Sequence, residues 1–387
     1  MKKLIFGYGA TGKSVETYFQ KNNIEYFIYD DDKEIEIQKN HKFEVNRFDE
    51  INEIIISPGI RPSHKLLNEI NSRGISVKTD IDLFNDIYNG KLIGVTGTNG
   101  KTTFVNLLTG YLNSQGIKAA AVGNVGRSPL EVIDKEFEYI VIELSSFQLY
   151  YLNNLNLHIA IILNIFQDHL DWHKNFDEYL GSKKRIKEFI KNGDSSMNES
   201  NFIGSLQPGV TNSNLYSDIK EKSIFFDNTV DIFMQVIKKL NLNYESAKEY
   251  LINSNNSEHR FELVDVHDGV TYINDSKSTN FNSVSMATTK VNNCILIMHG
   301  LTKNIDSKEL NISKEIKKII LPKDMKVNLN NIDSEVIELD SIFDLEENLE
   351  KSIHSGDTVL FSCGGASFND FKNYEERGNF FKTVVTN

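Results

Sequence analysis

The stretch KLIGVTGTNGKTTF, residues 91–104, decides the fold that this sequence predicts. Residues 91–96 form a short apolar run typical of a buried strand, and a glycine-rich turn follows directly. The apolar residues after the turn recur at helical spacing. A strand, a glycine-rich turn and a helix that opens with Lys-Thr-Thr together predict a loop that binds the phosphates of ATP.

The spacing of this loop differs from the strict phosphate-binding pattern. The pattern G-x-x-x-x-G-K-[ST] requires glycine at position 95, which is Val95, and Gly94 stands one residue too early. We expect backbone N–H groups to surround the phosphates, Lys101 to reach the β and γ oxygens, and Thr102 to bind Mg²⁺. The expected phosphate contacts are Gly97, Thr98, Asn99, Gly100, Lys101, Thr102 and Thr103. The alternative is a glycine turn beside a surface lysine.

Apolar strand patterns alternate with helical patterns on both sides of this loop. Such alternation is typical of parallel sheets in α/β proteins. At roughly 150 residues per domain, the length of 387 residues suggests two or three domains. The turn 88–90 and the polar run 253–257 are candidate boundaries. We therefore predict an α/β fold with three domains, which comprise residues 1–90, 91–256 and 257–387.

The composition excludes several classes of protein. The chain has 42 Lys+Arg against 54 Asp+Glu, and its net charge of −12 argues against a general nucleic-acid binder. Its two cysteines, Cys294 and Cys363, are too few for a disulfide framework and are expected to be free thiols. No apolar run approaches the roughly 18 residues that span a bilayer, and the start is too short for a signal peptide. We expect a cytoplasmic protein without membrane insertion, and a monomer.

Residues 7–12, GYGATG, match the pattern G-x-G-x-x-G between a strand and a helix. Asp30 ends the next strand, about 20 residues further on. Glycines allow the backbone to approach a phosphate, and the start of a helix favours an anion. The pattern predicts a bound NAD or another diphosphate nucleotide such as a UDP-sugar, and it does not separate the two. A tight turn without a ligand is the alternative.

Polar residues at two strand ends near the predicted phosphate loop are candidate metal ligands. Glu143 closes the strand 139–144, and Asp168 and His169 follow the strand 158–164. In parallel sheets, ligands gather at the carboxyl ends of strands, and a carboxylate beside a phosphate loop is suited to hold a metal ion. The alternatives are a partly exposed acid at a strand end and a structural histidine.

Lys183 is predicted to point into the protein. In the helical pattern 176–190 it lies three residues after Leu180 and three before Ile186, and both belong to the apolar stripe. A lysine directed inward needs a partner or a lowered pKa. A neutral amine at this position could react with CO₂ to form a carbamate, which is an anionic metal ligand. The alternative is a lysine at the edge of the stripe whose charge reaches water.

Polar clusters follow three strand patterns of the last domain. These clusters are residues 274–280, 299–303 and 362–367, and each is an ordinary loop by itself. Because the carboxyl ends of parallel strands share one edge of a sheet, the clusters together predict a second substrate pocket.

These motifs resemble those of the Mur ligases, the ATP-dependent amino-acid ligases of peptidoglycan precursor synthesis. The resemblance covers essentially the whole chain, and the loop spacing that departs from the strict pattern is the spacing that this family uses. The segments that carry it are GYGATG (7–12), SPGI (57–60), GVTGTNGKTT (94–103), GNVG (123–126), ELSSFQL (143–149), DHLDWH (168–173), SKKRI (182–186), HRFE (259–262), NDSKSTN (274–280) and SFNDFKNYEERG (367–378).

The resemblance implies a Rossmann-like UDP-binding domain, a central ATPase domain and a Rossmann-like C-terminal domain. It implies that the alanyl carboxylate of UDP-N-acetylmuramoyl-L-alanine attacks the γ-phosphate of ATP and forms an acyl phosphate. The amine of D-glutamate then attacks that carbonyl, and phosphate leaves. It also implies domain closure, with a hinge near Asn255. The residues themselves leave the choice between D- and L-glutamate open.

The resemblance assigns roles to single residues. Catalysis would involve Lys101, Glu143, His169 and Lys183. Two Mg²⁺ ions would be bound by Thr102, Glu143, His169 and carbamylated Lys183. The UDP-linked substrate would contact Thr11, Asp30, Gly59, Asn124, Ser145 and Gln148. ATP would also contact Arg260, Asn274 and Asp275, and D-glutamate would contact Lys277, Thr279, Lys303, Ser367 and Tyr374.

Two other functions fit parts of the pattern. A catalytically inactive nucleotide-binding regulator could share the fold, and the intact Lys101, Glu143 and Lys183 weigh against it. A NAD-dependent oxidoreductase is supported by GYGATG only and leaves the phosphate loop unexplained. The segment 299–303 keeps the lysine expected at D-glutamate, although Leu301 stands where relatives often carry an aspartate.

Overall fold

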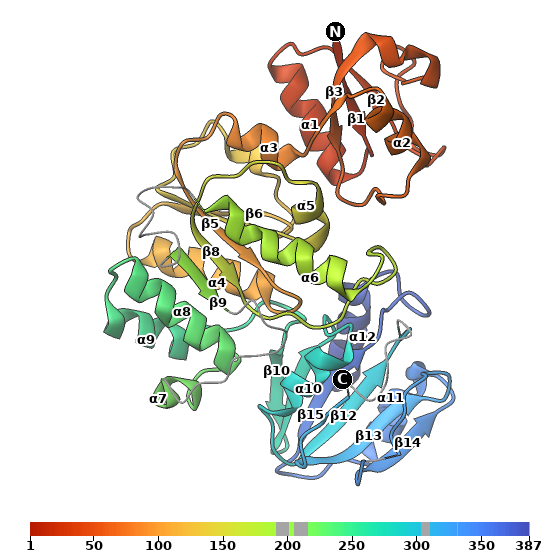
Figure 1. The fold of residues 1–387 in the computed structure, drawn as a ribbon. Coiled ribbons are helices and arrows are strands. Elements are labelled where there is room, and N and C mark those ends of the chain that lie inside the picture. The colour runs from red at the N-terminus through yellow and green to blue at the C-terminus, as the bar shows by residue number, and fades with distance from the viewer. Residues whose placement is uncertain (191–200, 205–215, 303–309, 331, 387) are drawn as a thin grey trace. The chain divides into compact units, whose positions relative to one another are not determined.

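The computed structural model describes residues 1–190, 201–204, 216–302, 310–330 and 332–386. The chain forms two compact units, residues 1–213 with 231–247 and residues 214–230 with 248–387. The described strands form three sheets, two in the first unit and one in the second (Figure 1).

The first sheet is parallel and has the strand order β2-β1-β3-β4. Its elements are β1 (Lys2–Phe6), α1 (Ala10–Lys21), β2 (Tyr26–Tyr29), the 3₁₀ helix η1 (Val45–Glu50), β3 (Ile51–Ile56), α2 (Lys65–Ser72), β4 (Ser76–Lys78) and α3 (Asp80–Asn85). Successive side chains of β1 enter different apolar clusters, because Leu4 and Phe6 pack on one face and Ile5 on the other. Both faces are therefore buried, which explains why these strands read as continuous apolar runs.

The second sheet is also parallel, with the order β6-β7-β5-β8-β9. Its elements are β5 (Lys91–Thr96), α4 (Lys101–Ser114), β6 (Ala119–Gly123), η2 (Pro129–Val132), β7 (Tyr139–Glu143), α5 (Ser146–Tyr151), β8 (Leu157–Ile162), α6 (Phe176–Lys184), η3 (Arg185–Phe189) and β9 (Phe202–Gly204). The predicted helical segment 176–190 is present as an α-helix that ends at Lys184 and a 3₁₀ helix that follows it to Phe189. Where the α-helix ends, the Arg185 guanidinium donates hydrogen bonds to carbonyls at the end of α5.

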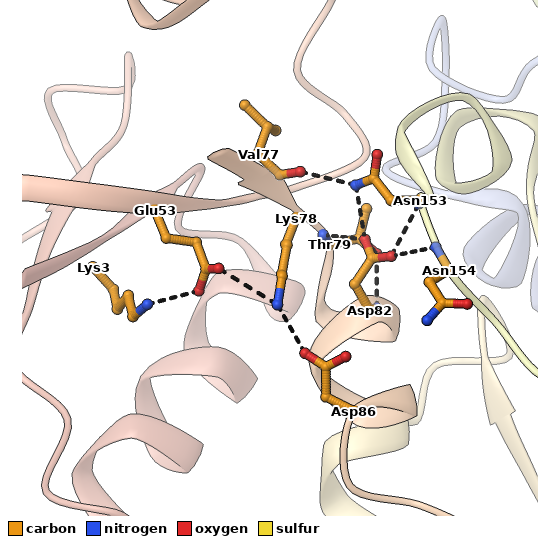
Figure 2. A network of polar contacts seen from close by, with 9 residues as sticks. All are labelled: Lys3, Glu53, Val77, Lys78, Thr79, Asp82, Asp86, Asn153 and Asn154. Carbon is orange, nitrogen blue, oxygen red and sulfur yellow. Dashed lines mark hydrogen bonds and ion pairs between the residues drawn. The ribbon is translucent and has the colours of Figure 1, made fainter. Parts of the chain in front are cut away.

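Helix α3 connects the two sheets of the first unit and is anchored by a buried carboxylate. Asp82 closes a capping box with Thr79, whose backbone N–H donates to Asp82 Oδ2 at 2.7 Å. The other oxygen, Oδ1, accepts the backbone N–H groups of Asn153 and Asn154 at 2.9 and 2.8 Å (Figure 2). One carboxylate therefore joins the start of α3 to the segment that follows α5.

Asp80, the first residue of α3, is a second buried carboxyl group with a less favourable environment. Its side chain is 3% exposed, and among the described residues its Oδ1 has no hydrogen-bond partner. Burial is the largest cause that raises the pKa of Asp80 to about 6. Because the ordinary value in an unfolded chain is about 3.9, folding favours the protonated form. The stability that this group contributes is present below about pH 4 and is lost as the pH rises through about 6.

We expect Asp80→Asn to raise the free energy of unfolding by about 1–3 kcal/mol at pH 7.5 and to change it little at pH 4, because one pKa unit corresponds to about 1.4 kcal/mol. Urea unfolding curves at both pH values measure the difference. Asp86→Asn, at the exposed end of the same helix, is the control and should change stability by less than about 1 kcal/mol at either pH. An equal effect of Asp80→Asn at both pH values would contradict the expectation.

The third sheet belongs to the second unit and has the order β10-β11-β15-β12-β13-β14, in which only the β10–β11 pair is antiparallel among the described strands. Its elements are β10 (Glu262–His267), β11 (Val270–Asp275), α10 (Phe281–Thr288), β12 (Cys294–His299), β13 (Ile316–Pro322), β14 (Glu335–Leu339), η6 (Ile342–Asp344), α11 (Leu345–Glu350), β15 (Thr358–Gly364) and α12 (Tyr374–Thr386). Cys294 and Cys363 are buried in apolar clusters on different faces of this sheet. Both are free thiols, as the sequence predicts.

Between the second sheet and the third, the described residues form three helices. They are α7 (Ser217–Lys220), α8 (Asp227–Lys239) and α9 (Tyr244–Asn253), and the predicted linker 253–257 begins where α9 ends. The three parallel-rich sheets confirm the predicted α/β fold class, while the domain boundaries at 90 and 256 stay a prediction. Within the described ranges, no helix is both long and apolar enough to cross a bilayer.

Candidate active site

The loop between β5 and α4 begins at Gly97, and Gly94 serves the packing of the sheet. A Cβ atom on Gly94 would lie 2.6 Å from a methyl group of Leu157 on the neighbouring strand β8. Gly94 is therefore part of the packed sheet and not of the loop. Gly100 has a φ of 79° and precedes α4, so that Lys101, Thr102 and Thr103 form its first turn.

The loop is held in shape by residues that follow β8. The Thr98 hydroxyl accepts the backbone N–H of Phe166 at 2.9 Å and lies 2.7 Å from the hydroxyl of Tyr179 in α6. Asn164 bonds to both backbone groups of Asn99, at 2.9 Å to its N–H and 3.1 Å to its carbonyl. These contacts fix the shape of the loop. Sequence reasoning missed Tyr179 and Asn164 as loop contacts, because both were read only as members of apolar or strand patterns.

Two lysines meet at one carbonyl oxygen of this loop. Lys101 Nζ donates to Gly97 O at 2.9 Å and to Thr98 O at 3.0 Å. Lys183 Nζ, from α6, donates to the same Gly97 O at 2.7 Å. The structure therefore brings Lys101, predicted to contact the phosphates of ATP, together with Lys183, predicted as a metal ligand in its carbamylated form.

Lys183 is buried, as its position on the apolar stripe predicts. Its side chain is 1% exposed, and its amine lies 4.8 Å from the centre of the Tyr179 ring. Burial is the first cause that lowers the pKa of Lys183 well below its ordinary value, and repulsion from Lys101 is the second. Asp168 and Glu143 act in the opposite direction. The neutral amine, which is the nucleophilic form, is thus favoured.

Glu143 lies beside the start of α4 and is 1% exposed. Its carboxylate accepts the Thr102 hydroxyl at 2.8 Å and the Asn124 side-chain amide at 2.8 Å. Asn124 also donates its backbone N–H to Glu143 O at 3.0 Å. Two predicted site residues, Thr102 in the first turn of α4 and Asn124 after β6, therefore share the Glu143 carboxylate, and oxygen atoms of these side chains are the donor type that Mg²⁺ prefers.

His169 and its neighbour Asp168 lie after β8. The His169 side chain is 37% exposed and its backbone is left-handed with φ 56°, while Asp168 is buried. The two side chains are 3.9 Å apart, and the His169 ring packs edge to face on Phe147. In the described part of the chain, no group of three His, Cys, Asp or Glu side chains is placed to hold a metal ion.

The residues predicted for the UDP group lie at the carboxyl edge of the first sheet. Asp30 accepts the backbone N–H of Tyr8 in the glycine loop at 2.5 Å, and the Ser57 hydroxyl donates to Gly7 O at 2.8 Å. The three strand ends after β1, β2 and β3 are thereby tied together. The residues predicted there are Thr11 in the first turn of α1, Asp30 after β2 and Gly59 after β3.

Ser145 and Gln148 form the capping box of α5. The Ser145 hydroxyl accepts the Gln148 N–H at 3.2 Å, and the Gln148 side-chain oxygen accepts the Ser145 N–H at 2.9 Å. These groups have a structural role that sequence reasoning did not predict. Their place after β7, directly behind Glu143, is the strand end where they were expected.

The second unit gathers another set of predicted residues at the ends of β11 and β15. Asp275 accepts the hydroxyl of Ser362 at 2.8 Å, that of Ser278, and the backbone N–H of Phe261 at 3.0 Å. Burial is the main cause that raises the pKa of Asp275 to about 6. Asn274 is fully buried and lies 2.9 Å from the His259 ring.

The residues predicted for the amino acid lie around this edge of the second unit. Lys277 Nζ is 3.7 Å from the centre of the Tyr374 ring, Ser367 is buried, and Thr279 and Arg260 are partly buried. The predicted Lys303 lies outside the described residues.

Sequence reasoning missed Arg377 in α12, which is 0% exposed. Its guanidinium donates to the carbonyls of Ser276 at 2.6 Å, Gly365 at 2.9 Å and His299 at 3.0 Å, and to the Ser276 hydroxyl at 3.0 Å. One cation therefore joins the loops that follow β11, β12 and β15. The sequence does contain a signal that Arg377 is buried. It lies four residues before the buried Phe381 and so falls on the inner face of its helix.

Comparisons with known proteins agree with this arrangement. Residues 95–206 match the family model described as Mur ligase middle domain, and residues 1–79 match the model described as Mur ligase MurD-like, N-terminal domain. A Buchnera aphidicola protein named UDP-N-acetylmuramoylalanine--D-glutamate ligase is 32% identical, with 99% of this chain and 97% of that protein covered. A protein of the same name from Thermosipho melanesiensis is 30% identical, with 100% of this chain and 97% of that protein covered.

Solved structures share the fold. A MurF ligase from Thermotoga maritima, solved in complex with ADP, superimposes with a TM-score of 0.56 at 14% identity, covering 99% of this chain and 94% of that one. At this level of identity the likeness concerns the fold only.

Proposed function

The chain belongs to the Mur ligase family, and on this premise we propose that it joins D-glutamate to UDP-N-acetylmuramoyl-L-alanine with the use of ATP. The identity of about one third to relatives with that name extends over nearly the whole of both chains. The reaction would be an amide-forming step of peptidoglycan precursor synthesis in the cytoplasm. The monomeric state stays a prediction.

The observation that carries the proposal is the convergence of Lys101, Glu143 and Lys183 at the loop 97–103. A carboxylate is a poor electrophile, so it must be activated before an amine can attack it. In the proposed reaction the alanyl carboxylate oxygen attacks the γ-phosphorus of ATP, and ADP leaves. The amine of D-glutamate then attacks the acyl carbon, the amine loses a proton, and phosphate leaves with the former carboxylate oxygen.

Two anions meet in the first step, and the cations of the site would reduce their repulsion. We assign to Lys101 the β- and γ-phosphates, for which it would exchange its present carbonyl partners in the loop. Mg²⁺, when bound, would shield the negative charge of the phosphates. We propose two such ions, for which the hydroxyl of Thr102 and the carboxylate of Glu143 are suitable ligands, with His169 and modified Lys183 as further ligands.

Lys183 is proposed to act as a carbamate. Its neutral amine nitrogen would attack the carbon of CO₂, a nitrogen–carbon bond would form, and one proton would leave. The product is an anion with two oxygen donors in place of a buried amine. The burial of Lys183 and the lowered pKa of its amine support this modification.

The remaining residues are assigned to substrates by their positions. We propose that the UDP-linked substrate is bound by Thr11, Asp30, Gly59, Asn124, Ser145 and Gln148. We propose that Arg260, Asn274 and Asp275 bind ATP. We propose that D-glutamate is bound by Lys277, Thr279, Lys303, Ser367 and Tyr374.

The proposed function predicts that ADP and phosphate are formed only when ATP, UDP-N-acetylmuramoyl-L-alanine and D-glutamate are all present. A phosphate-release assay that omits each component in turn measures this requirement, and a panel of amino acids that includes L-glutamate defines the acceptor. Lys101→Met should reduce the rate by about 10²–10³-fold, because one cation at the phosphates is lost. Equal phosphate release without the amino acid would refute the proposal.

A further inference from the structure

Two aromatic side chains from the region of the second sheet hold the backbone of the loop 57–60. Tyr151, the last residue of α5, donates its hydroxyl to Ile60 O at 2.8 Å, and Trp172 donates its indole N–H to Gly59 O at 3.3 Å. The two rings also pack edge to face with their centres 6.0 Å apart. Two carbonyls of a loop that follows β3 therefore depend on donors from elements of another sheet.

Tyr151 belongs to a segment that is bonded on both sides of it. Arg185 donates to three carbonyls at the end of α5, those of Leu149, Tyr150 and Leu152. The next two backbone N–H groups, of Asn153 and Asn154, bond to the carboxylate of Asp82 (Figure 2). The donor to Ile60 is therefore fixed from both sides, while Ser57 bonds the start of the loop 57–60 to Gly7 of its own sheet.

Helix α5 joins two places that we assigned to the same substrate. Gly59, near its end at Tyr151, is proposed to contact the UDP part, and Ser145 and Gln148, at its start, are proposed to contact the muramoyl-alanyl part. The helix has six residues, which corresponds to a length of about 9 Å. A rigid element of fixed length therefore separates the contacts for the two ends of one molecule.

We propose that Tyr151 and Trp172 are positioning residues for the UDP-linked substrate. They fix the loop 57–60 at a set distance from the phosphate loop, so that a substrate held by its nucleotide end presents its carboxylate to ATP. The inference rests on the proposed function and adds to it a selection for substrate length. Neither side chain needs to touch the reacting atoms.

The test compares Tyr151→Phe with Tyr150→Phe. The two residues are adjacent in α5, and the described residues offer the Tyr150 hydroxyl no hydrogen-bond partner. Loss of one neutral hydrogen bond corresponds to roughly a 3- to 10-fold change. We expect Tyr151→Phe to raise KM for UDP-N-acetylmuramoyl-L-alanine by this factor and to leave KM for ATP and for D-glutamate unchanged. Tyr150→Phe should have the KM values of the wild type. An unchanged KM for the UDP-linked substrate, or an equal rise in all three, overturns the proposal.

Trp172 supplies a binding measurement that does not depend on turnover, because it is the only tryptophan of the chain. Its emission should change when UDP-N-acetylmuramoyl-L-alanine is added without ATP, and in Tyr151→Phe the titration should move to about 3- to 10-fold higher concentration. If Tyr151→Phe binds UDP-N-acetylmuramoyl-L-alanine at the wild-type concentration while the wild type turns over normally, the positioning role is wrong and the ligase reaction stands. Binding at the expected concentration without ADP formation in the full assay defeats the proposed ligase reaction and leaves the positioning role standing.

Trp172→Phe is the second variant and keeps an aromatic ring while it removes the donor to Gly59. We expect the same selective rise in KM for the UDP-linked substrate. If Tyr151→Phe and Trp172→Phe differ from the wild type only in thermal stability, the two residues are structural and the proposal is wrong.

Discussion

Replacement of Lys183 by alanine is expected to reduce the ligase rate by about 10²–10³-fold or more, because the proposed carbamate ligand of Mg²⁺ is lost. The truncation also leaves a cavity next to Gly97, where the Lys183 amine now donates its hydrogen bond. Formate or acetate can enter such a cavity and supply the missing carboxylate oxygens. We therefore expect partial recovery of activity at high concentrations of these acids, measured as ADP formation with all three substrates.

Lys184→Ala is the matched control for this experiment. Lys184 is the next residue in α6 and is only partly buried, so that the variant should keep the wild-type rate without added acid. Nuclear magnetic resonance after exposure to ¹³C-labelled CO₂ offers a direct view of the carbamate, whose signal should be absent from Lys183→Ala. Full activity of Lys183→Ala would show that no carbamate is needed.

Arg377→Met is expected to lower the free energy of unfolding of the second unit by about 3–5 kcal/mol. The substitution leaves the buried carbonyls of Ser276, His299 and Gly365 without their donor. Each unsatisfied buried group costs about 1–3 kcal/mol, and water that enters the space recovers part of this loss. Denaturant unfolding followed by circular dichroism measures the change.

The matched control is Lys351→Met, which removes an exposed cation directly after α11 of the same unit. The Lys351 side chain is 68% exposed and pairs with Glu347 along the helix, so its loss should change stability by less than about 0.5 kcal/mol. A similar small effect for Arg377→Met would mean that the loops after β11, β12 and β15 do not depend on its guanidinium.

Local patterns predicted much of the fold. The strand 91–96 was assigned with the bounds that β5 has, because its apolar residues are contiguous and a glycine-rich turn follows. Lys183 was correctly placed inside because helical spacing relates it to Leu180 and Ile186. In each case the signal lies within a few residues of the position that it predicts.

Contacts between distant residues were beyond such reasoning. Tyr179 was expected in the core, but its hydroxyl meets Thr98, which is 81 residues away in the chain. Arg377 finds its acceptors in loops that lie 12 to 101 residues away. The sequence pattern predicts that a side chain faces inward. Its contact partner depends on the order of strands in the sheet, because that order decides which strand ends are neighbours.

The two cysteines of the third sheet have a practical consequence for thiol chemistry. Burial raises the pKa of Cys294 to about 12 and that of Cys363 to about 11, so little of the reactive thiolate forms at neutral pH. Alkylating reagents can modify either thiol only when its apolar cluster opens. Because the clusters lie on different faces of the sheet, the rates at which the two sites become alkylated, read by mass spectrometry, report separately on the opening of each face.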